Sequence, residues 1–323
     1  MRIGVHGGTF HCDDVLACFM LHETTPFKTA KIVRTRDPEL LEKMDAVVDV
    51  GGVYCAERFR YDHHQRGFDE KMTELGCDTK LSSVGLVYRH HGADLIASLL
   101  KIPADSETLQ LIYKNIYRSF VEAIDGHDNG ISQYREDVAP RYLVTTSLTS
   151  RIARMNPEWN EDAQNIDHKF QEAMAVAGAE FTDHVRRMYY TWLPARTIVE
   201  KSISERFDVD KSGQIVVLDR WCPWNEHLLD IEASTLLGSP LRYVIFSSNA
   251  TDWRVQAVPS DVGSYVSRLS LPKALQGMSG EKLSTLAGIP DCVFVHANGF
   301  VGGAKTYESA LKLAKKALEE IHQ

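Results

Sequence analysis

The first third of the chain alternates short apolar runs with amphipathic segments. Apolar residues at helical spacing predict a helix at Asp13–His22, with acidic residues at its start. An aspartate cap followed by proline predicts a second helix from Asp37-Pro38 to about Met44. Strands are expected at Arg2–His6, Lys31–Thr35, Ala46–Val50 and Arg58–Asp62. Strands that alternate with short helices predict a mostly parallel sheet, and ligands bind beyond the carboxyl ends of its strands.

The pattern changes twice along the rest of the chain. Helices are expected at Ser82–His91, about Ser106–Asp125 and about Ala163–Trp192, and Leu193-Pro194 is expected to break the last of them. The segment ARTIVEKSISERF then begins a further helix. Strands follow at Gln214–Asp219, Arg242–Ser248, Trp253–Val258 and Cys292–Ala297, before an amphipathic helix at Thr306–Ile321. We therefore predict an α/β domain over residues 1–192, a linker helix over 193–207 and a smaller α/β domain over 208–323.

Composition narrows the class of protein. The chain has 323 residues, which is enough for two domains with full cores, and no apolar run approaches the roughly 20 residues that span a bilayer. Because it starts with a strand-like segment, we expect no signal peptide and a cytoplasmic location, with nuclear or organellar import left open. Six cysteines without C-x-x-C spacing indicate reduced thiols. The net charge of −8 excludes general attraction to nucleic acid, so a polyanion would need a local basic groove.

The segment HGGTFHCDD, from His6 to Asp14, is the first candidate site. His6 ends a strand, two glycines permit a tight turn, and His11 and Asp13 precede a helix. Imidazole and carboxylate together suit manganese, iron or zinc better than calcium, which prefers oxygen ligands alone. Taken alone, the same residues also fit a phosphate-binding glycine turn, or a helix capped by Asp13 beside two incidental histidines.

Two further strand ends carry acids and histidines. Asp49 lies in the apolar run VVDVGG, where burial is costly unless the carboxylate is paired or bound to metal. Its two oxygens can bridge cations about 3.5–4 Å apart, although capping of the following glycine turn is an alternative. In RYDHH, side chains of an extended segment alternate, so one of His63 and His64 can bind metal while the other faces substrate. Asp62 would orient an imidazole or support the turn.

The segment AIDGHDNGISQY adds two acids at a helix end. Asp125 and Asp128 lie three residues apart, just before an Asn-Gly turn. Either carboxylate could point back towards the sheet edge. Alone, this motif is weak, because the sequence DNG is mostly a turn signal.

Together these residues resemble a known family. A strand-end histidine, a following aspartate, a strand-end aspartate, Asp-His-His and a helix-end aspartate occur in the order of the ligands of the DHH phosphoesterases. The motifs HGGTFHCDDVLACFML, VVDVGG, YDHHQRGF, DNGISQY, SLTSRIARMNP, CPWNEHL, RLSLP and IPDCVFVHANGFVGGAKTYESAL resemble the Myg (melanocyte proliferating gene) family over almost the whole chain. The resemblance implies a mostly parallel-sheet DHH-type catalytic domain that binds metal, followed by a smaller α/β substrate-binding domain.

The resemblance also implies residue roles. His6 and His11 would bind a first cation, and Asp49 would bridge both cations. Asp13, His63 and Asp128 would bind the second, with Asp125 as the alternative to Asp128. His64 would contact the scissile phosphate and, with Asp49 and Asp62, form the catalytic group. Where the DHH enzymes place two aspartates two residues apart, this chain has His11 and Asp13, so the preferred metal is open among manganese, the first expectation, and magnesium, iron or zinc.

The second domain carries candidates for substrate contact. Gly302 and Gly303 precede Lys305 and a helix, an arrangement that resembles the glycine turn with which DHH enzymes grip the distal end of a substrate. Arg268 and His296 are further candidates for contact with phosphate. Trp221 and Trp224 could stack on bases but are more typical of a core or an interface.

Three functions stay open at this point. The favoured one is a two-metal 3′–5′ exonuclease that acts on RNA. The alternatives are a hydrolase of small phosphoanhydrides or short oligonucleotides, similar to a pyrophosphatase, and a non-catalytic metal-binding protein. RNA or a short oligonucleotide is the expected partner, no membrane is expected, and assembly into a homo-oligomer is left open.

Overall fold

The computed structural model describes residues 1–135, 137–161, 165–235, 237–248 and 251–320. Contacts divide the chain into two compact units, Met1–Tyr189 and Tyr190–Gln323, which are considered separately. Each unit contains a five-stranded mixed sheet with helices, so the predicted mixed α/β class is confirmed. No helix in the described part of the chain is both long and apolar enough to cross a membrane.

The sheet of the first unit has the strand order β2-β1-β3-β5-β4. Its strands are β1 (Arg2–Val5), β2 (Lys31–Arg34), β3 (Ala46–Val48), β4 (Tyr54–Cys55) and β5 (Arg60–Tyr61). Four of them run parallel, and only β4 pairs antiparallel, with β5. The carboxyl ends of β1, β3 and β5 therefore lie next to one another at one edge of the sheet.

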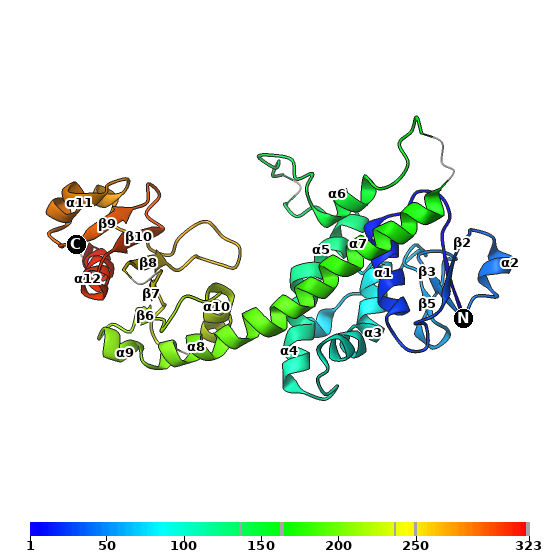
Figure 1. Ribbon diagram of the computed structural model, residues 1–323, viewed down its shortest axis with the longest axis horizontal. Coiled ribbons are helices and arrows are strands. Elements are labelled where there is room, and N and C mark those ends of the chain that lie inside the picture. Colours follow the sequence, from blue (N-terminus) through cyan, green and yellow to red (C-terminus); the bar gives the residue numbers. More distant parts are fainter. Residues whose placement is uncertain (136, 162–164, 236, 249–250, 321–323) are drawn as a thin grey trace. The chain divides into compact units, whose positions relative to one another are not determined.

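The helices of the first unit include α1, most of which is buried against its neighbours (Figure 1). They are α1 (Cys12–His22), α2 (Pro38–Leu41), α3 (Ser83–Leu100), α4 (Glu107–Ile116), the π-helix η3 (Tyr117–Val121), α5 (Glu122–Asp128), α6 (Leu148–Ala153) and α7 (Ile166–Arg187), with short 3₁₀ turns at Ala56–Arg58 and Thr73–Leu75. Helix α1 contacts both α3 and α7. Its burial places the acids of its first turn inside the protein.

The predicted helix end at His91 is wrong, because α3 continues to Leu100. Gly92 does not terminate the helix. It is a packing position, since a Cβ atom there would lie 2.7 Å from the Tyr88 ring. The helix ends instead at Lys101, which adopts a left-handed conformation with φ 56°.

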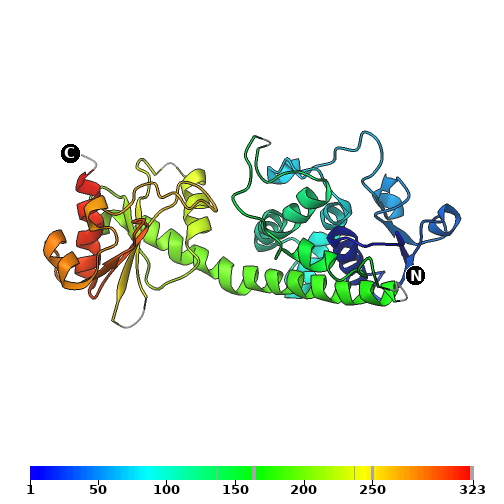
Figure 2. The ribbon, with the colours of Figure 1, turned by 90° about the horizontal axis from the view of Figure 1, so that it is seen from above.

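The predicted break at Leu193-Pro194 is also wrong. The residues stay in helical conformation from α7 through the π-helix η4 (Met188–Trp192) into α8 (Leu193–Ser204), and these elements are drawn in green in Figure 2. Pro194 occupies the first turn after a wider π turn, where the hydrogen-bond pattern already shifts and its missing N–H costs little. The predicted start of this segment at Ala163 lies outside the described residues.

The second unit has a sheet of order β6-β7-β8-β10-β9, in which only β6 and β7 are parallel. Its strands are β6 (Ile215–Val217), β7 (Tyr243–Ser247), β8 (Trp253–Ala257), β9 (Cys292–Val295) and β10 (Val301–Ala304). Its helices are α8, α9 (Arg206–Val209), α10 (Asn225–Ser234), a short 3₁₀ turn (Lys273–Leu275), α11 (Gly280–Ala287) and α12 (Tyr307–Glu319). The predicted end of the last helix at Ile321 lies outside the described residues.

Two apolar cores stabilise this second unit. One core includes residues of α11 and α12, and the other includes residues of α8 and α10. In the second of these cores, Ala195, Val199 and Ile203 of the predicted linker helix are buried. Gly302 and Gly303 do not form the predicted turn, because they lie inside β10 and pair with β8 and β9. Strand β10 was not predicted from the sequence, because it is rich in glycine.

Candidate metal centre

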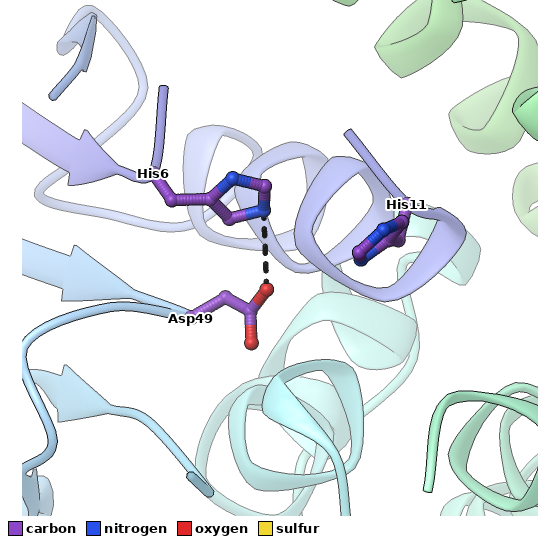
Figure 3. A group of neighbouring side chains, drawn as sticks. All are labelled: His6, His11 and Asp49. Carbon is purple, nitrogen blue, oxygen red and sulfur yellow. Dashed lines mark ion pairs between the residues drawn. The ribbon is translucent and has the colours of Figure 1, made fainter. Parts of the chain in front are cut away.

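Three neighbouring strand ends bring the predicted ligands together. His6 follows β1, Asp49 follows β3, and Asp62–His64 follow β5. His6 and Asp49 extend towards each other from adjacent strands, and His11 lies beside them at the start of α1 (Figure 3). The parallel pairing of the strands explains this convergence of residues that are distant in sequence.

The Asp49 carboxylate stands between two imidazoles. Its Oδ2 atom lies 3.3 Å from His6 Nε2, and its Oδ1 atom lies 3.2 Å from His63 Nε2. All three side chains are buried. Asp49 has φ 57°, a left-handed conformation that is uncommon for a residue other than glycine and that clusters at functional sites. Each oxygen of one carboxylate thus faces a different histidine, which is the arrangement expected of a bridging ligand.

The first turn of α1 adds two fully buried acids. Asp14 Oδ2 lies 2.8 Å from His6 Nε2, and Asp14 Oδ1 accepts a hydrogen bond from the His11 backbone N–H at 2.9 Å. Asp13 Oδ2 accepts a hydrogen bond from Ser83 Oγ at 2.7 Å. Of these two acids, both in the first candidate segment, sequence reasoning gave a ligand role to Asp13 and not to Asp14. The spacing His11-x-x-Asp14, which forms a capping box, is the signal that could have identified it.

The structure separates the two acids at the end of α5. Asp128 Oδ2 lies 3.1 Å from His63 Nε2, within the cluster. Asp125 instead accepts hydrogen bonds from Ser82, Gly85 and Tyr117, and no candidate metal group found in the described residues includes it. Between the two predicted alternatives, the geometry therefore favours Asp128.

Three overlapping groups of side chains could each hold a cation. They are His6, His11 and Asp49; Asp49, His63 and His64; and His11, Asp13 and Asp128. Within each group the nearest ligand atoms lie within 4.8 Å of one another. Asp49 and His11 each belong to two groups, so the donors form one continuous cluster.

The nitrogen and oxygen atoms of the cluster are better placed to bind a cation than to form hydrogen bonds with one another. Five buried atoms of the cluster lack a hydrogen-bond partner among the described residues: His6 Nε2, Asp13 Oδ1, Asp14 Oδ2, Asp49 Oδ1 and His63 Nε2. Some of these atoms are close enough for ion pairs, but they do not point along hydrogen-bond directions. Buried polar groups are rarely left in this state without a ligand. A set of imidazole nitrogens and carboxylate oxygens is typical of manganese, iron or zinc sites.

The pKa values of the cluster also indicate that its surroundings favour positive charge. Burial lowers the pKa of His6, but the neighbouring carboxylates of Asp14 and Asp49 outweigh it and raise the pKa to about 10. For His63, burial is likewise outweighed by Asp128 and Asp49, and its pKa rises to about 9. Burial and the charges of Asp49 and Asp128 raise the pKa of Asp13 well above its ordinary value. Cations would relieve this crowding of carboxylates.

Asp62 and His64 form the outer side of the cluster. Asp62 Oδ1 accepts hydrogen bonds from the backbone N–H groups of His63 and His64, and it lies 2.8 Å from His64 Nδ1. Its other oxygen accepts a hydrogen bond from the Gly52 N–H. Through these contacts Asp62 holds the turn at Gly52 and the orientation of the His64 imidazole. The His64 side chain is 62% exposed, so it is accessible to a substrate.

Sequence reasoning also missed Arg36. It lies just after β2, lines a cavity of about 350 Å³ together with His6, Asp49 and His64, and contacts Gly7 O at 3.2 Å and His6 Nδ1 at 3.3 Å. It forms no ion pair with a carboxylate in the described part of the chain. The rule that ligands bind at strand ends, applied to β2, would have identified it.

The predicted residues of the second unit are in different environments. Arg268 forms an ion pair with Glu232 and donates a hydrogen bond to Leu241 O at 3.2 Å, so its charge is already balanced. His296, after β9, and Lys305, after β10, are exposed. Trp224 belongs to a core, as expected, whereas Trp221 is 61% exposed.

Comparison with known proteins decides the family. The family described as "Uncharacterised protein family (UPF0160)", named MYG1_exonuc, matches residues 2–318. This chain belongs to the MYG1 exonuclease family. The MYG1 exonucleases of Bos taurus and Homo sapiens are each 46% identical to it over 324 residues, which cover 99% of this chain and 85% and 86% of theirs. The MYG1 protein of Caenorhabditis elegans is 46% identical over 98% of this chain and 95% of its own. The predicted Myg membership is therefore confirmed, while kinship with the DHH phosphoesterases stays a prediction.

Proposed function

We propose that this protein is a divalent-metal-dependent phosphodiester hydrolase, and more narrowly a 3′–5′ exonuclease that acts on RNA. The single observation that carries the proposal is the Asp49 carboxylate, whose two oxygens lie 3.3 and 3.2 Å from the Nε2 atoms of His6 and His63. The names of the mammalian relatives, MYG1 exonuclease, support nuclease activity. The order of motifs shared with the DHH phosphoesterases supports a two-metal phosphoesterase with a separate substrate-binding domain.

The residues of the cluster divide between two proposed cations. His6, His11 and Asp49 would hold one, and Asp49, Asp13, His63 and Asp128 would hold the other. Manganese is the proposed metal, and magnesium, iron and zinc are the alternatives. When bound, such cations supply Lewis acidity, which lowers the pKa of water and offsets charge on a phosphoryl group. Asp14 Oδ2 lies 2.8 Å from the same His6 Nε2 atom that faces Asp49, so Asp14 is a further candidate ligand beside the first cation.

Side chains at the rim would bind the phosphate. The exposed His64 ring, held by Asp62, is placed to donate a hydrogen bond to a phosphoryl oxygen. Arg36 adds a positive charge on the same cavity without a carboxylate partner in the described residues. Fixed donors of this kind stabilise the charge that builds on phosphoryl oxygens in the transition state. His64 and Arg36 therefore position the phosphate and offset its charge.

The second unit is proposed to contact the rest of the substrate. His296 and Lys305 are exposed at the ends of β9 and β10 and can donate to phosphate. Arg268 is already paired with Glu232, and Gly302 and Gly303 lie within β10. We therefore assign these three residues a structural role rather than contact with the substrate.

Labelled single-stranded RNA provides the test. Protein stripped of metal with a chelator is incubated with 5′-labelled RNA, with and without Mn²⁺. We expect the labelled RNA to shorten one nucleotide at a time from its 3′ end only when Mn²⁺ is present. Release of phosphate from pyrophosphate, without RNA degradation, would replace the proposal with a phosphoanhydride hydrolase. Metal binding without turnover of either substrate would leave a non-catalytic metal-binding protein.

A further inference from the structure

Two neighbouring cavities, neither of which is lined by Arg36, lie near the metal centre. The inner pocket has a volume of about 220 Å³, and the outer pocket about 710 Å³. The inner pocket is lined by His11, Cys12, Asp13, Ile124, His127, Asp128, Thr149 and Ala153. Ile124, His127 and Thr149 line both pockets, so the two cavities are neighbours at α5 and α6. We call the two pockets together the trench, and three of the proposed metal ligands, His11, Asp13 and Asp128, line its inner pocket.

The inner pocket has the chemistry of a site for a flat heterocycle. Ile124 and Ala153 provide apolar walls, whereas His127 and Thr149 place a ring nitrogen and a hydroxyl at the edge. Binding sites for small organic groups combine apolar surfaces with a few placed polar groups in this way. A nucleobase presents apolar faces and polar edges. Because the pocket adjoins Asp13 and Asp128, a base in it would lie next to a phosphate at the metal centre.

The outer pocket is rich in hydroxyl groups and nearly balanced in charge. Its lining includes Thr79, Ser119, Ser132, Ser147, Thr149 and Ser150, and its charged side chains are Arg118 and Glu122. Hydroxyls donate and accept hydrogen bonds, as riboses and base edges also do. The lining carries no surplus of positive charge to hold a phosphate by itself. It therefore suits the nucleoside parts of a chain whose scissile phosphate is held elsewhere.

We propose that this trench binds consecutive nucleosides of a single-stranded oligonucleotide, on the polymer side of the scissile phosphate. The inner pocket takes the base next to the metal centre, and the outer pocket takes the nucleoside that follows. This inference rests on the proposed nuclease function and adds to it a substrate class: single strands that extend at least two nucleosides beyond the cleaved bond. Pyrophosphate and other small phosphoanhydrides would leave the trench empty.

Filling the outer pocket tests the inference. Ala123 is an exposed alanine of α5 that lines the outer pocket and not the inner one. We expect Ala123→Trp to raise the Kd for a fluorescein-labelled uridine octamer about tenfold, because filling the outer pocket would remove the contribution of about one bound base. The matched control is Ala175→Trp, an exposed alanine of α7 that lines neither pocket, which should change the Kd less than twofold. Binding is measured by fluorescence anisotropy in EDTA, so that no cleavage occurs.

The length of the ligand separates the outer pocket from the rest of the site. With Mn²⁺ present, the ratio of kcat/KM for the octamer to that for the dinucleotide UpU should fall about tenfold in Ala123→Trp. Octamer binding equal to wild type in Ala123→Trp, or an equal loss in Ala175→Trp, would overturn the inference. If the tryptophan variant does not fold, Ala123→Glu with Ala175→Glu as its control replaces it, since an added negative charge also opposes a bound polyanion.

Failure of the nuclease proposal would look different from failure of this inference. If the wild-type protein cleaves no RNA with Mn²⁺ but Ala123→Trp still weakens octamer binding in EDTA, the trench stands and the hydrolase proposal falls. If the wild-type protein cleaves RNA and the trench variant binds and cleaves the octamer normally, the hydrolase proposal stands and the trench falls.

Discussion

The polar side chains near the strand ends of the two sheets are in different environments. In the first unit, the ends of β1, β3 and β5 carry buried donors that lack hydrogen-bond partners among the described residues, including His6 Nε2, Asp49 Oδ1 and His63 Nε2. In the second unit, His296 after β9 and Lys305 after β10 are exposed, Arg268 is paired with Glu232, and Gly303 packs within β10. The charge of Arg268 is thus balanced within the fold, and Gly303 has a packing role. A buried polar cluster that its own fold leaves unsatisfied indicates a ligand site, and a satisfied one indicates structure.

The largest expected effect is the loss of activity in Asp49→Asn. The replacement keeps the size of the side chain but removes the charge that two cations would share. Residues that only orient a ligand cost 10- to 100-fold when replaced, so we expect about a thousandfold loss of RNA cleavage for a shared ligand. Gel assays with Mn²⁺ measure the rate, and Asp183→Asn, an exposed aspartate of α7, is the control. A variant at Asp49 with more than half of wild-type activity would remove the contrast between the two units.

Removal of metal should destabilise the first unit. A ligand that binds only the folded state stabilises it by about 2.7 kcal/mol when its concentration is 100 times Kd. We therefore expect the melting temperature of chelator-treated protein to rise when Mn²⁺ is added in calorimetry. The rise should disappear in Asp49→Asn and remain in Gly303→Ala. An equal rise in all three proteins would place the stabilising metal away from the cluster.

Asp125 contrasts with the acids of the cluster, because it is a buried acid of the first unit whose oxygens accept hydrogen bonds within the fold. Burial raises its pKa to about 7 despite hydrogen bonds from Ser82, Tyr117 and Gly85. Because the folded-state pKa lies above the unfolded value, the folded state favours the neutral acid. Stability from this group is therefore complete at low pH and is lost as pH rises towards 7.

Relative to Asp125→Asn, the unfolding free energy of the wild-type protein should fall by on the order of 2 kcal/mol between pH 5 and pH 7. Urea titrations at several pH values provide the measurement. A difference that stays constant with pH would show that Asp125 is ionised throughout, held by its four hydrogen bonds.

The smallest effect is expected at the glycine pair of β10. A Cβ atom at Gly303 would lie 2.8 Å from Phe294 Cε1 and 2.9 Å from Arg254 Nη1. We expect Gly303→Ala to cost about 1 kcal/mol, because the arginine side chain can move. Gly126→Ala is the control, since the nearest atom there, Thr79 Cγ2, is 3.8 Å away. Loss of RNA cleavage by Gly303→Ala at unchanged stability would instead place substrate against this strand.

The strand ends explain how much of the site could be predicted. Alternating strands and helices predicted a parallel arrangement, and the strand-end rule then gathered His6, Asp49 and His63. The same pattern could not show that α1 is buried on nearly all sides, so Asp14 was taken for an ordinary acid of a first helical turn. The left-handed backbone of Asp49 also has no signature in the sequence, because it arises from the tertiary structure around it.

Glycine and proline caused the errors in the fold. Gly92 within α3 and Gly303 within β10 lie close to neighbouring side chains, and a glycine at such a packing position looks the same in a sequence as a glycine in a turn. Pro194 follows a π turn, which local reasoning cannot anticipate. Arg36 was missed because charged residues after an edge strand are common on solvated surfaces.

The most direct measurement is anomalous diffraction from crystals of the protein grown with Mn²⁺. The account predicts two anomalous peaks about 3.5–4 Å apart, one towards His6 and one towards His63, with the Asp49 carboxylate between them. A single peak, or peaks that Asp49 does not contact, would contradict it.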